Sequence, residues 1–125
     1  MNYYIDVSKE MGRGLYAAHD LQAGKVLFSA ELLVLSDVDT IAVNKTDLQY
    51  YTFKYTATQD CLVLGDGEIF NHNDTPNIGY VLQDVEGRKV MTFYLLKDVE
   101  ARSQLFIDYA ADTQADVSKY TINLY

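Results

Sequence analysis

The sequence predicts a mostly β protein with several short strands in small sheets and one or two short helices. Short runs rich in β-branched and aromatic residues recur along the chain, and glycines separate them. Helical periodicity is confined to one short segment near the middle. The 125 residues fit one domain, and a chain of this size can bury roughly two-thirds of its unfolded surface in a single core.

The expected strands are separated by turn residues. They cover Tyr3 to Val7, Lys25 to Leu35, Asn77 to Gln83, Lys89 to Leu96 and Gln104 to Tyr109. The third and fourth of these runs predict a hairpin closed around Glu86-Gly87, because such a pair suits a tight turn between two strands. Gly12-Arg13-Gly14 is expected to break the chain after the first strand, and Ala23-Gly24 to turn it into the second.

One helix is expected near the middle of the chain. Thr46 and Gln49 fit a capping box, and Tyr51 and Tyr55 follow at helical spacing. Aromatic residues at such spacing are more typical of a buried face than of a site, so we expect the run Tyr50 to Phe53 to contribute to the core.

Composition narrows the partners. The net charge of −8 and the pI near 4.5 argue against direct binding of nucleic acid and favour a cationic partner, although an acidic surface also simply aids solubility. No apolar run of 18 residues is present, so no membrane contact is expected. The N-terminus has no signal-peptide pattern, which predicts a cytoplasmic protein. The single cysteine, Cys61, excludes an internal disulfide and suits a reducing compartment.

The glycine motif Gly12-Arg13-Gly14-Leu15-Tyr16-Ala17 literally matches the dinucleotide pattern G-x-G-x-x-A. That pattern requires a long helix after the turn, so that a pyrophosphate can sit on the helix N-terminus. Here Gly24 and a strand-like run follow instead, which excludes a Rossmann fold. Taken alone, the motif is best interpreted as an ordinary turn.

A second stretch, from Gly65 to Asn77, combines acidic and amide side chains with a histidine. A metal site is not favoured, because the adjacent side chains of His72, Asn73 and Asp74 diverge and the chain has only two histidines and one cysteine. The stretch also lacks the ligand spacing of a calcium loop. An Asn/Asp-rich turn before Pro76 would explain the composition. It would not explain an Asn-His pair directly after an apolar Ile-Phe.

Three motifs, taken in order, resemble those of the SET-domain family of protein-lysine methyltransferases. The glycine motif with the later Gly24 resembles the first of them, and Phe70-Asn71-His72-Asn73-Asp74-Thr75-Pro76-Asn77 resembles F-N-H-S-x-x-P-N, with Asn73 in place of serine. Val99 to Tyr109 resembles I-x-x-G-E-E-L-x-x-D-Y-G, with Arg102-Ser103 in place of Gly-Glu. The likeness is to minimal viral and bacterial members. An unrelated acidic β-domain would require the three motifs to coincide by chance.

The resemblance implies the β-clip SET fold with a C-terminal pseudoknot. Residues 1–110 would form the SET domain, and residues 111–125 would be a short tail that is a candidate for closing the substrate channel. No cysteine-rich zinc flap is present, so no metal is expected. The short viral-type members pair, which makes a homodimer an expectation as well. A viral or effector protein could also act in the nucleus or in a host.

The resemblance further implies transfer of a methyl group from S-adenosylmethionine to the ε-amine of a lysine. The substrate would be a basic, histone-like protein or peptide with an exposed lysine; the alternative is a catalytically inactive SET-like binding module. The implied cofactor-binding residues are Gly12, Arg13, Gly14, Phe70, Asn71 and His72. Among them, Asn71 would bind the amino group and the backbone of His72 would read the adenine. Tyr109 would be the catalytic tyrosine, and Tyr51 would line the lysine channel.

Overall fold

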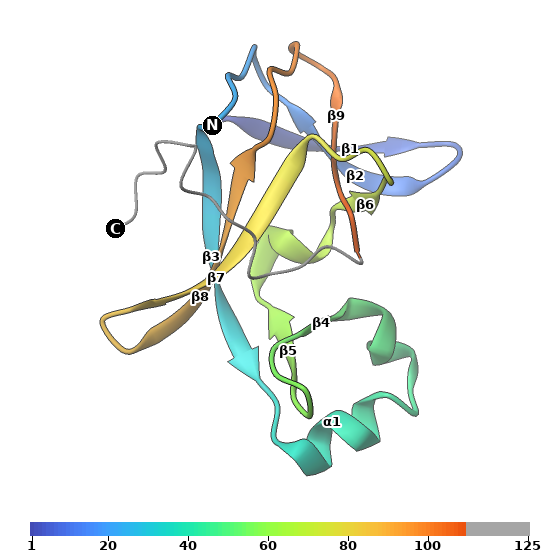
Figure 1. The fold of residues 1–125 in the computed structure, drawn as a ribbon. Helices are drawn as coiled ribbons and strands as arrows, with labels where there is room; N and C mark the ends of the chain where they lie inside the picture. The colour runs from blue at the N-terminus through green and yellow to red at the C-terminus, as the bar shows by residue number, and fades with distance from the viewer. Residues whose placement is uncertain (110–125) are drawn as a thin grey trace.

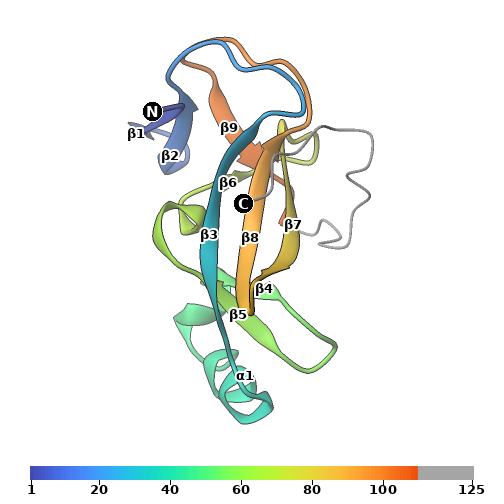
Figure 2. The ribbon, with the colours of Figure 1, turned by 90° about the vertical axis from the view of Figure 1, so that its left-hand side faces the viewer.

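The computed structural model describes residues 1–109 and arranges their nine strands in two sheets, with short helical segments between them (Figures 1 and 2). The mostly β class is therefore confirmed. The four-stranded sheet has the order β1-β2-β9-β6, and the five-stranded sheet has the order β4-β5-β3-β8-β7. The strands are β1 (Tyr3–Ser8), β2 (Gly12–Ala17), β3 (Val26–Val34), β4 (Thr52–Lys54), β5 (Asp60–Val63), β6 (Asn71–His72), β7 (Ile78–Val85), β8 (Arg88–Leu95) and β9 (Gln104–Ile107).

The predicted hairpin is confirmed as β7 and β8, which pair antiparallel from Ile78 opposite Leu95 to Val85 opposite Arg88. Glu86 and Gly87 close it with φ angles of 52° and 83°. Two successive positive φ angles match the right-handed twist of the flanking strands, as in a type I′ turn. Val90 to Leu95 of β8 are all buried, and the strand is central in its sheet, with β7 on one edge and β3 on the other.

The prediction of a turn at Gly12-Arg13-Gly14 is wrong. These residues begin β2, which pairs antiparallel with β1, and the chain reverses before them at residues 9–11. Gly14 is buried, and a Cβ atom there would lie 2.4 Å from Nε2 of Gln104. The second glycine of the motif therefore permits close packing of a side chain against the backbone rather than a reversal of the chain.

The predicted helix near the middle is much shorter than expected. It is a 3₁₀ segment, η1 (Asp47–Tyr51), and β4 begins directly after it, so Tyr55 is not helical. The Thr46 hydroxyl accepts from the Leu48 N–H and not from Gln49, and Gln49 Nε2 donates to the Thr46 carbonyl. The reciprocal bonds of a capping box are therefore absent, and pairing of β4 with β5 ends the helical turn.

A helix that the prediction missed, α1 (Asp37–Val43), lies at the end of the molecule away from β1 and β2 (Figures 1 and 2). The Ser36 hydroxyl caps it by accepting the Asp39 N–H, and the acidic residues Asp37 and Asp39 occupy its first turn. Both features stabilise a helix N-terminus. The spacing of Ser36 and Asp39 is a sequence signal that could have revealed it.

The core lies between the two sheets and is rich in aromatic side chains. Phe70, Phe93 and Phe28 contact one another with ring centroids 4.8 to 5.8 Å apart, and Tyr80 adds a further ring 6.0 Å from Phe93. Offset and tilted ring pairs of this kind add stability beyond the burial of their surface. The predicted core role of Tyr50 and Tyr51 is wrong, since their side chains are 75% and 50% exposed.

The last described strand, β9, is inserted between β2 and β6 and is held against the loop that follows β6. Asn77 makes two of the bonds: its Oδ1 accepts from the Phe106 N–H at 2.8 Å, and its Nδ2 donates to the Gln104 carbonyl at 2.9 Å. The Tyr80 hydroxyl donates to the Asp108 carbonyl. These bonds fix the segment that leads to Tyr109. The predicted tail, residues 111–125, lies outside the described residues.

Candidate active site

The three sequence motifs, far apart along the chain, meet around β6. Asn71 and His72 form this strand, which pairs in parallel with Phe106 and Ile107 of β9. The Asn71 side chain donates from Nδ2 to the Arg13 carbonyl at 2.9 Å, which ties β6 to the glycine motif. Because β6 is the end strand of its sheet, its outer edge is unpaired by any strand of the described chain.

Tyr109 forms hydrogen bonds with Phe70 and His72, the two residues that flank Asn71 in the sequence. Its hydroxyl donates to the Phe70 carbonyl at 2.6 Å, and its backbone N–H donates to Nδ1 of His72 at 3.0 Å. The rings of Tyr109 and His72 lie 5.1 Å apart. The phenol is thus directed back into the molecule from an otherwise half-exposed residue.

The contacts of His72 define its neutral tautomer. Since Nδ1 accepts a hydrogen bond from Tyr109, the proton resides on Nε2, which donates to Oδ1 of Asp74 at 2.8 Å. The imidazole therefore links the Asp74 turn to the backbone of Tyr109. His72 is thus a positioning group for the C-terminal segment. The backbone contact with adenine that the resemblance implies for it stays a prediction.

A cavity of about 300 Å³ brings Tyr51 and Tyr109 together. Its wall includes the aromatic residues Tyr50, Tyr51, Phe53, Phe70 and Tyr109, and the acidic residue Glu68. Aromatic rings around a small opening suit the apolar stem of a long side chain, and a carboxylate suits a cation at its tip. Phe70 itself is 2% exposed and belongs to the core, so it shapes the cavity from beneath.

Two titratable groups in the cavity are perturbed. Burial raises the pKa of Glu68 to about 7, in spite of the hydrogen bond that its carboxylate accepts from Val63. Burial, and secondarily the negative charge of Glu68, raise the pKa of Tyr109 above its usual value of 10.0. The Tyr109 phenol therefore stays protonated at neutral pH and acts as a hydrogen-bond donor.

The side chain of Gln104, beside the glycine motif, carries a hydrogen-bond donor without a partner among the described residues. Nε2 of Gln104 is buried and has no hydrogen-bond partner among the described residues. It lies over Gly14 together with Nδ2 of Asn71, 2.4 and 2.9 Å from the place of a Cβ atom there. Buried donors are rarely left unpaired, so this one indicates a place for an acceptor. Sequence reasoning missed Gln104, although it occupies a Glu position of the third motif.

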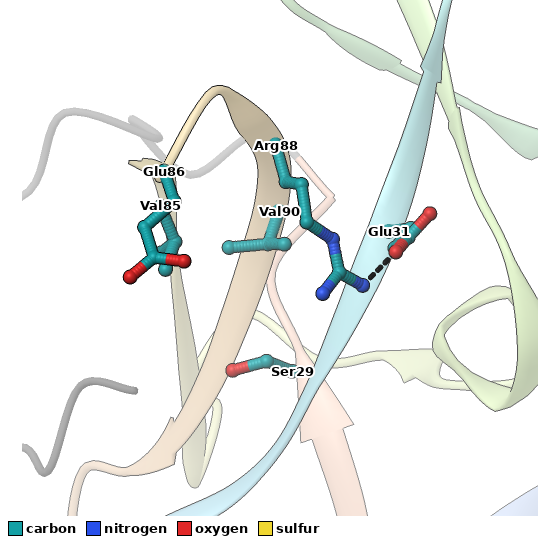
Figure 3. A pocket seen from close by; sticks show the side chains of 6 residues that line it. All are labelled: Ser29, Glu31, Val85, Glu86, Arg88 and Val90. Atoms are coloured by element: carbon teal, nitrogen blue, oxygen red, sulfur yellow. Dashed lines mark hydrogen bonds and ion pairs between the residues drawn. The ribbon is translucent and has the colours of Figure 1, made fainter.

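A second cavity, of about 180 Å³, lies beside the β7–β8 hairpin and is lined by Ser29, Glu31, Val85, Glu86, Arg88 and Val90 (Figure 3). In Figure 3 the Arg88 guanidinium reaches from β8 toward Glu31 on β3, with which it forms an ion pair. None of the predicted site residues faces this cavity, and it has no aromatic wall. The site is therefore assigned to the cavity of Tyr51 and Tyr109.

The departures from the expected motifs have local explanations. Asn73, in place of serine, accepts with Oδ1 from both the N–H and the hydroxyl of Thr75, which forms an Asx turn. Arg102, in place of glycine, has a φ angle of 71° in the left-handed region. The first replacement keeps a hydrogen-bonding side chain at this turn, whereas the second strains the backbone.

Neither a metal site nor a membrane-spanning helix is found within residues 1–109. No group of three or more His, Cys, Asp or Glu side chains in this part of the chain is placed to hold a metal ion. None of its helices combines the length and the apolar character that a bilayer span requires.

Comparisons with known proteins agree on one family. The model of the SET domain family matches residues 12–110. A histone-lysine N-methyltransferase of Schizosaccharomyces pombe, H3 lysine-37 specific, is 26% identical over 103 residues, which cover 82% of this chain and 69% of the relative.

Solved structures share the fold. A histone methyltransferase structure from Plasmodium falciparum superposes with a TM-score of 0.71 at 19% identity, covering 89% of this chain and 95% of that one. A chain of Polycomb Repressive Complex 2 from Chaetomium thermophilum, in an autoinhibited conformation bound to S-adenosylmethionine, gives 0.73 at 20% identity. It covers 94% of this chain, which spans only 16% of that much longer one.

Proposed function

The chain belongs to the SET domain family, and from this membership we propose that it is a protein-lysine N-methyltransferase that uses S-adenosylmethionine. The observation that carries the proposal is the position of Tyr109. It lies in the wall of an aromatic cavity and is hydrogen-bonded to Phe70 and His72 on either side of Asn71. This arrangement joins the proposed cofactor motif, Asn71-His72, to the aromatic cavity.

The residues beside β6 fit the amino-acid end of S-adenosylmethionine. Nδ2 of Asn71 already donates to the Arg13 carbonyl. The amide oxygen of Asn71, Oδ1, is therefore the atom that would accept a hydrogen bond from the cofactor's ammonium group. Nε2 of Gln104 is the unsatisfied donor for an acceptor such as a carboxylate. The cofactor would supply a methyl group activated by a sulfonium charge, and the outer edge of β6 at His72 would face its adenine.

The attacking lysine must be neutral. Its reference pKa is about 10.4, so deprotonation at pH 7 costs roughly 4.6 kcal/mol. The aromatic wall formed by Tyr51, Phe70 and Tyr109 disfavours the ammonium form and lowers this cost. With its own pKa raised above 10.0, Tyr109 is no base at neutral pH. Its role is to orient the amine and to stabilise the polarised methyl group.

The substrate proposed is a basic protein or peptide with an exposed lysine. The net charge of −8 attracts a Lys/Arg-rich segment over distances set by screening. The Schizosaccharomyces pombe relative is described as specific for a histone lysine, which supports a histone-like tail as the first substrate to try. The alternative, a catalytically inactive binding module, predicts binding of such a peptide without transfer. Pairing of two copies stays a prediction that sedimentation would test.

Replacement of Tyr109 by Phe tests the proposal. We expect Tyr109→Phe to retain binding of S-adenosylmethionine and to lower turnover about a hundredfold, because the hydroxyl acts on the polarised methyl group and not on the cofactor's amino-acid end. Calorimetry would measure cofactor binding, and methyl transfer to an Arg-rich peptide with one lysine would measure turnover.

Tyr4→Phe is the matched control, since Tyr4 lies on β1, is 37% exposed and stacks on Tyr16 away from the cavity. It should leave both quantities unchanged. Turnover of Tyr109→Phe equal to that of the wild type would remove Tyr109 from the reaction. Absence of cofactor binding by the wild-type protein would favour the inactive binding module.

A further inference from the structure

We propose that Glu68 receives the ammonium group of the substrate lysine and takes up its proton before methyl transfer. This inference rests on the proposed function and adds a residue to it, since the protonated phenol of Tyr109 cannot accept that proton. The observation behind it is that the half-buried residue Glu68 lines the same aromatic cavity, near enough to Tyr109 for its negative charge to act on that phenol.

The backbone holds Glu68 in a fixed place. It ends the 3₁₀ segment η2 (Gly65–Glu68), which packs tightly on β5 and on Phe93: a Cβ atom at Gly67 would lie 2.4 Å from Cγ1 of Val63 and 3.1 Å from Cε2 of Phe93. Oε1 of Glu68 accepts the Val63 N–H at 2.7 Å. The other carboxylate oxygen of Glu68, Oε2, is left to bind a ligand.

Glu68 has no cationic partner within residues 1–109, where the ion pairs join other residues. Burial of an isolated charge is costly, so a cationic ligand would stabilise this half-buried carboxylate. An alkylammonium ion that enters between Tyr51 and Tyr109 would supply the missing charge until it gives its proton to the carboxylate. The ligand class that fits the wall is therefore a primary amine on an apolar stem.

The titration of Glu68 suits this role. Burial raises its pKa to about 7, and a base with a pKa near the working pH is the most effective proton acceptor. The phenols of Tyr50, Tyr51 and Tyr109 line the cavity with it, and the Cys61 thiol lies on the neighbouring β5. The Tyr109 phenol and the Cys61 thiol stay protonated at neutral pH, because burial raises the pKa of both. The other nearby carboxylates have their own partners. Asp66 of the same segment accepts a hydrogen bond from the Tyr3 hydroxyl, and Glu31 of the adjoining β3 forms an ion pair with Arg88.

The proposed reaction has two steps, a proton transfer to Glu68 and a methyl transfer to the lysine nitrogen. The lysine ammonium gives one proton to Oε2 of Glu68, which leaves a neutral amine and a neutral carboxyl group. The amine lone pair then forms the nitrogen–carbon bond as the carbon–sulfur bond breaks, and that electron pair stays on the sulfur of the donor. The product nitrogen carries the positive charge, and Glu68 returns its proton to water when the product leaves.

The pH profile of Glu68→Gln tests the inference, because glutamine keeps the acceptor for the Val63 N–H and removes the base. In the wild type, turnover on an Arg-rich peptide with one lysine should rise to a plateau above about pH 7. In the variant, turnover at about pH 7 should fall at least about tenfold and should climb continuously toward about pH 10, where the free lysine loses its own proton. Glu100→Gln, an exposed control on the far turn, should keep the wild-type profile.

Two readouts that need no catalysis separate this inference from the proposed function. The carboxyl carbon signal of Glu68 should titrate near pH 7 in the wild type, and it should shift when the lysine peptide binds but not when its norleucine counterpart does. A protein that shows this shift without transferring methyl would overturn the proposed function alone. Parallel pH profiles of the wild type and Glu68→Gln, or a Glu68 signal indifferent to the lysine, would overturn the inference.

Discussion

At the scale of single residues, Gly14 shows how one missing side chain organises the site. A Cβ atom there would lie within 3 Å of both Nε2 of Gln104 and Nδ2 of Asn71. Both are ends of flexible side chains, so the chain could still fold around an alanine by moving them. The displaced atoms are those proposed to hold the cofactor, so we expect the effect of a substitution to fall on binding rather than on folding.

Gly14→Ala should therefore weaken binding of S-adenosylmethionine at least about tenfold while thermal stability changes by only about 1 kcal/mol. Gly87→Ala is the matched control. It places a Cβ atom in open space at a φ angle of 83°, so it should cost about 1 kcal/mol of stability through backbone strain and leave binding unchanged. Calorimetry and thermal unfolding of both variants would measure this. Equal cofactor affinity in the two variants would contradict the role given to Gly14.

At the scale of secondary-structure elements, the turn before β9 carries a strained residue. Arg102 has a φ angle of 71°, and its backbone N–H donates to the Ala17 carbonyl at 2.7 Å, which ties this turn to the end of β2. The conformation is fixed by that bond and not by the arginine side chain. Glycine, which the family motif has here, adopts the same conformation without the clash of its Cβ atom.

Arg102→Gly should accordingly raise the free energy of unfolding by about 0.5 to 1 kcal/mol, the relief of strain being partly offset by the greater freedom of glycine in the unfolded chain. Arg102→Ala keeps the strain and removes the charge, so it should give no such gain. Chemical denaturation of the three proteins would measure the difference. A stabilisation by alanine as large as that by glycine would assign the effect to charge.

Elements with strong local signals were predictable from the sequence, and those decided by distant contacts were not. The pair Glu86-Gly87 is a local turn signal between two strand-like runs, so the hairpin was predicted correctly. The helix expected after Thr46 ends early because β5, a strand that was not predicted, pairs with the residues that follow it. Gly14 was interpreted as a turn because the side chain that packs on it, Gln104, lies ninety residues farther along the chain.

The same distinction holds for the site. Asn71, His72 and Tyr109 were found because a resemblance joined their motifs, and the structure brings these residues together. Glu68 was overlooked since its importance depends on burial and on Tyr109 across the cavity, neither of which a linear sequence displays.

At the scale of the whole molecule, the net charge of −8 bears on how a substrate arrives rather than on the reaction itself. Attraction between an acidic protein and a basic tail acts before contact and is screened beyond about 10 Å at an ionic strength near 0.1 M. The cavity, in contrast, holds its single carboxylate half-buried, where salt screens much less. Binding of the tail and transfer at the lysine should therefore respond differently to salt.

Raising the salt concentration from about 50 to about 500 mM should increase KM for an Arg-rich lysine peptide at least about fivefold, with kcat changed by less than about twofold. A peptide of the same length in which glutamine replaces every arginine is the control, and its KM should start high and depend little on salt. Steady-state kinetics with both peptides would measure this. If the two peptides responded alike, the acidic surface would serve solubility and would have no part in substrate capture.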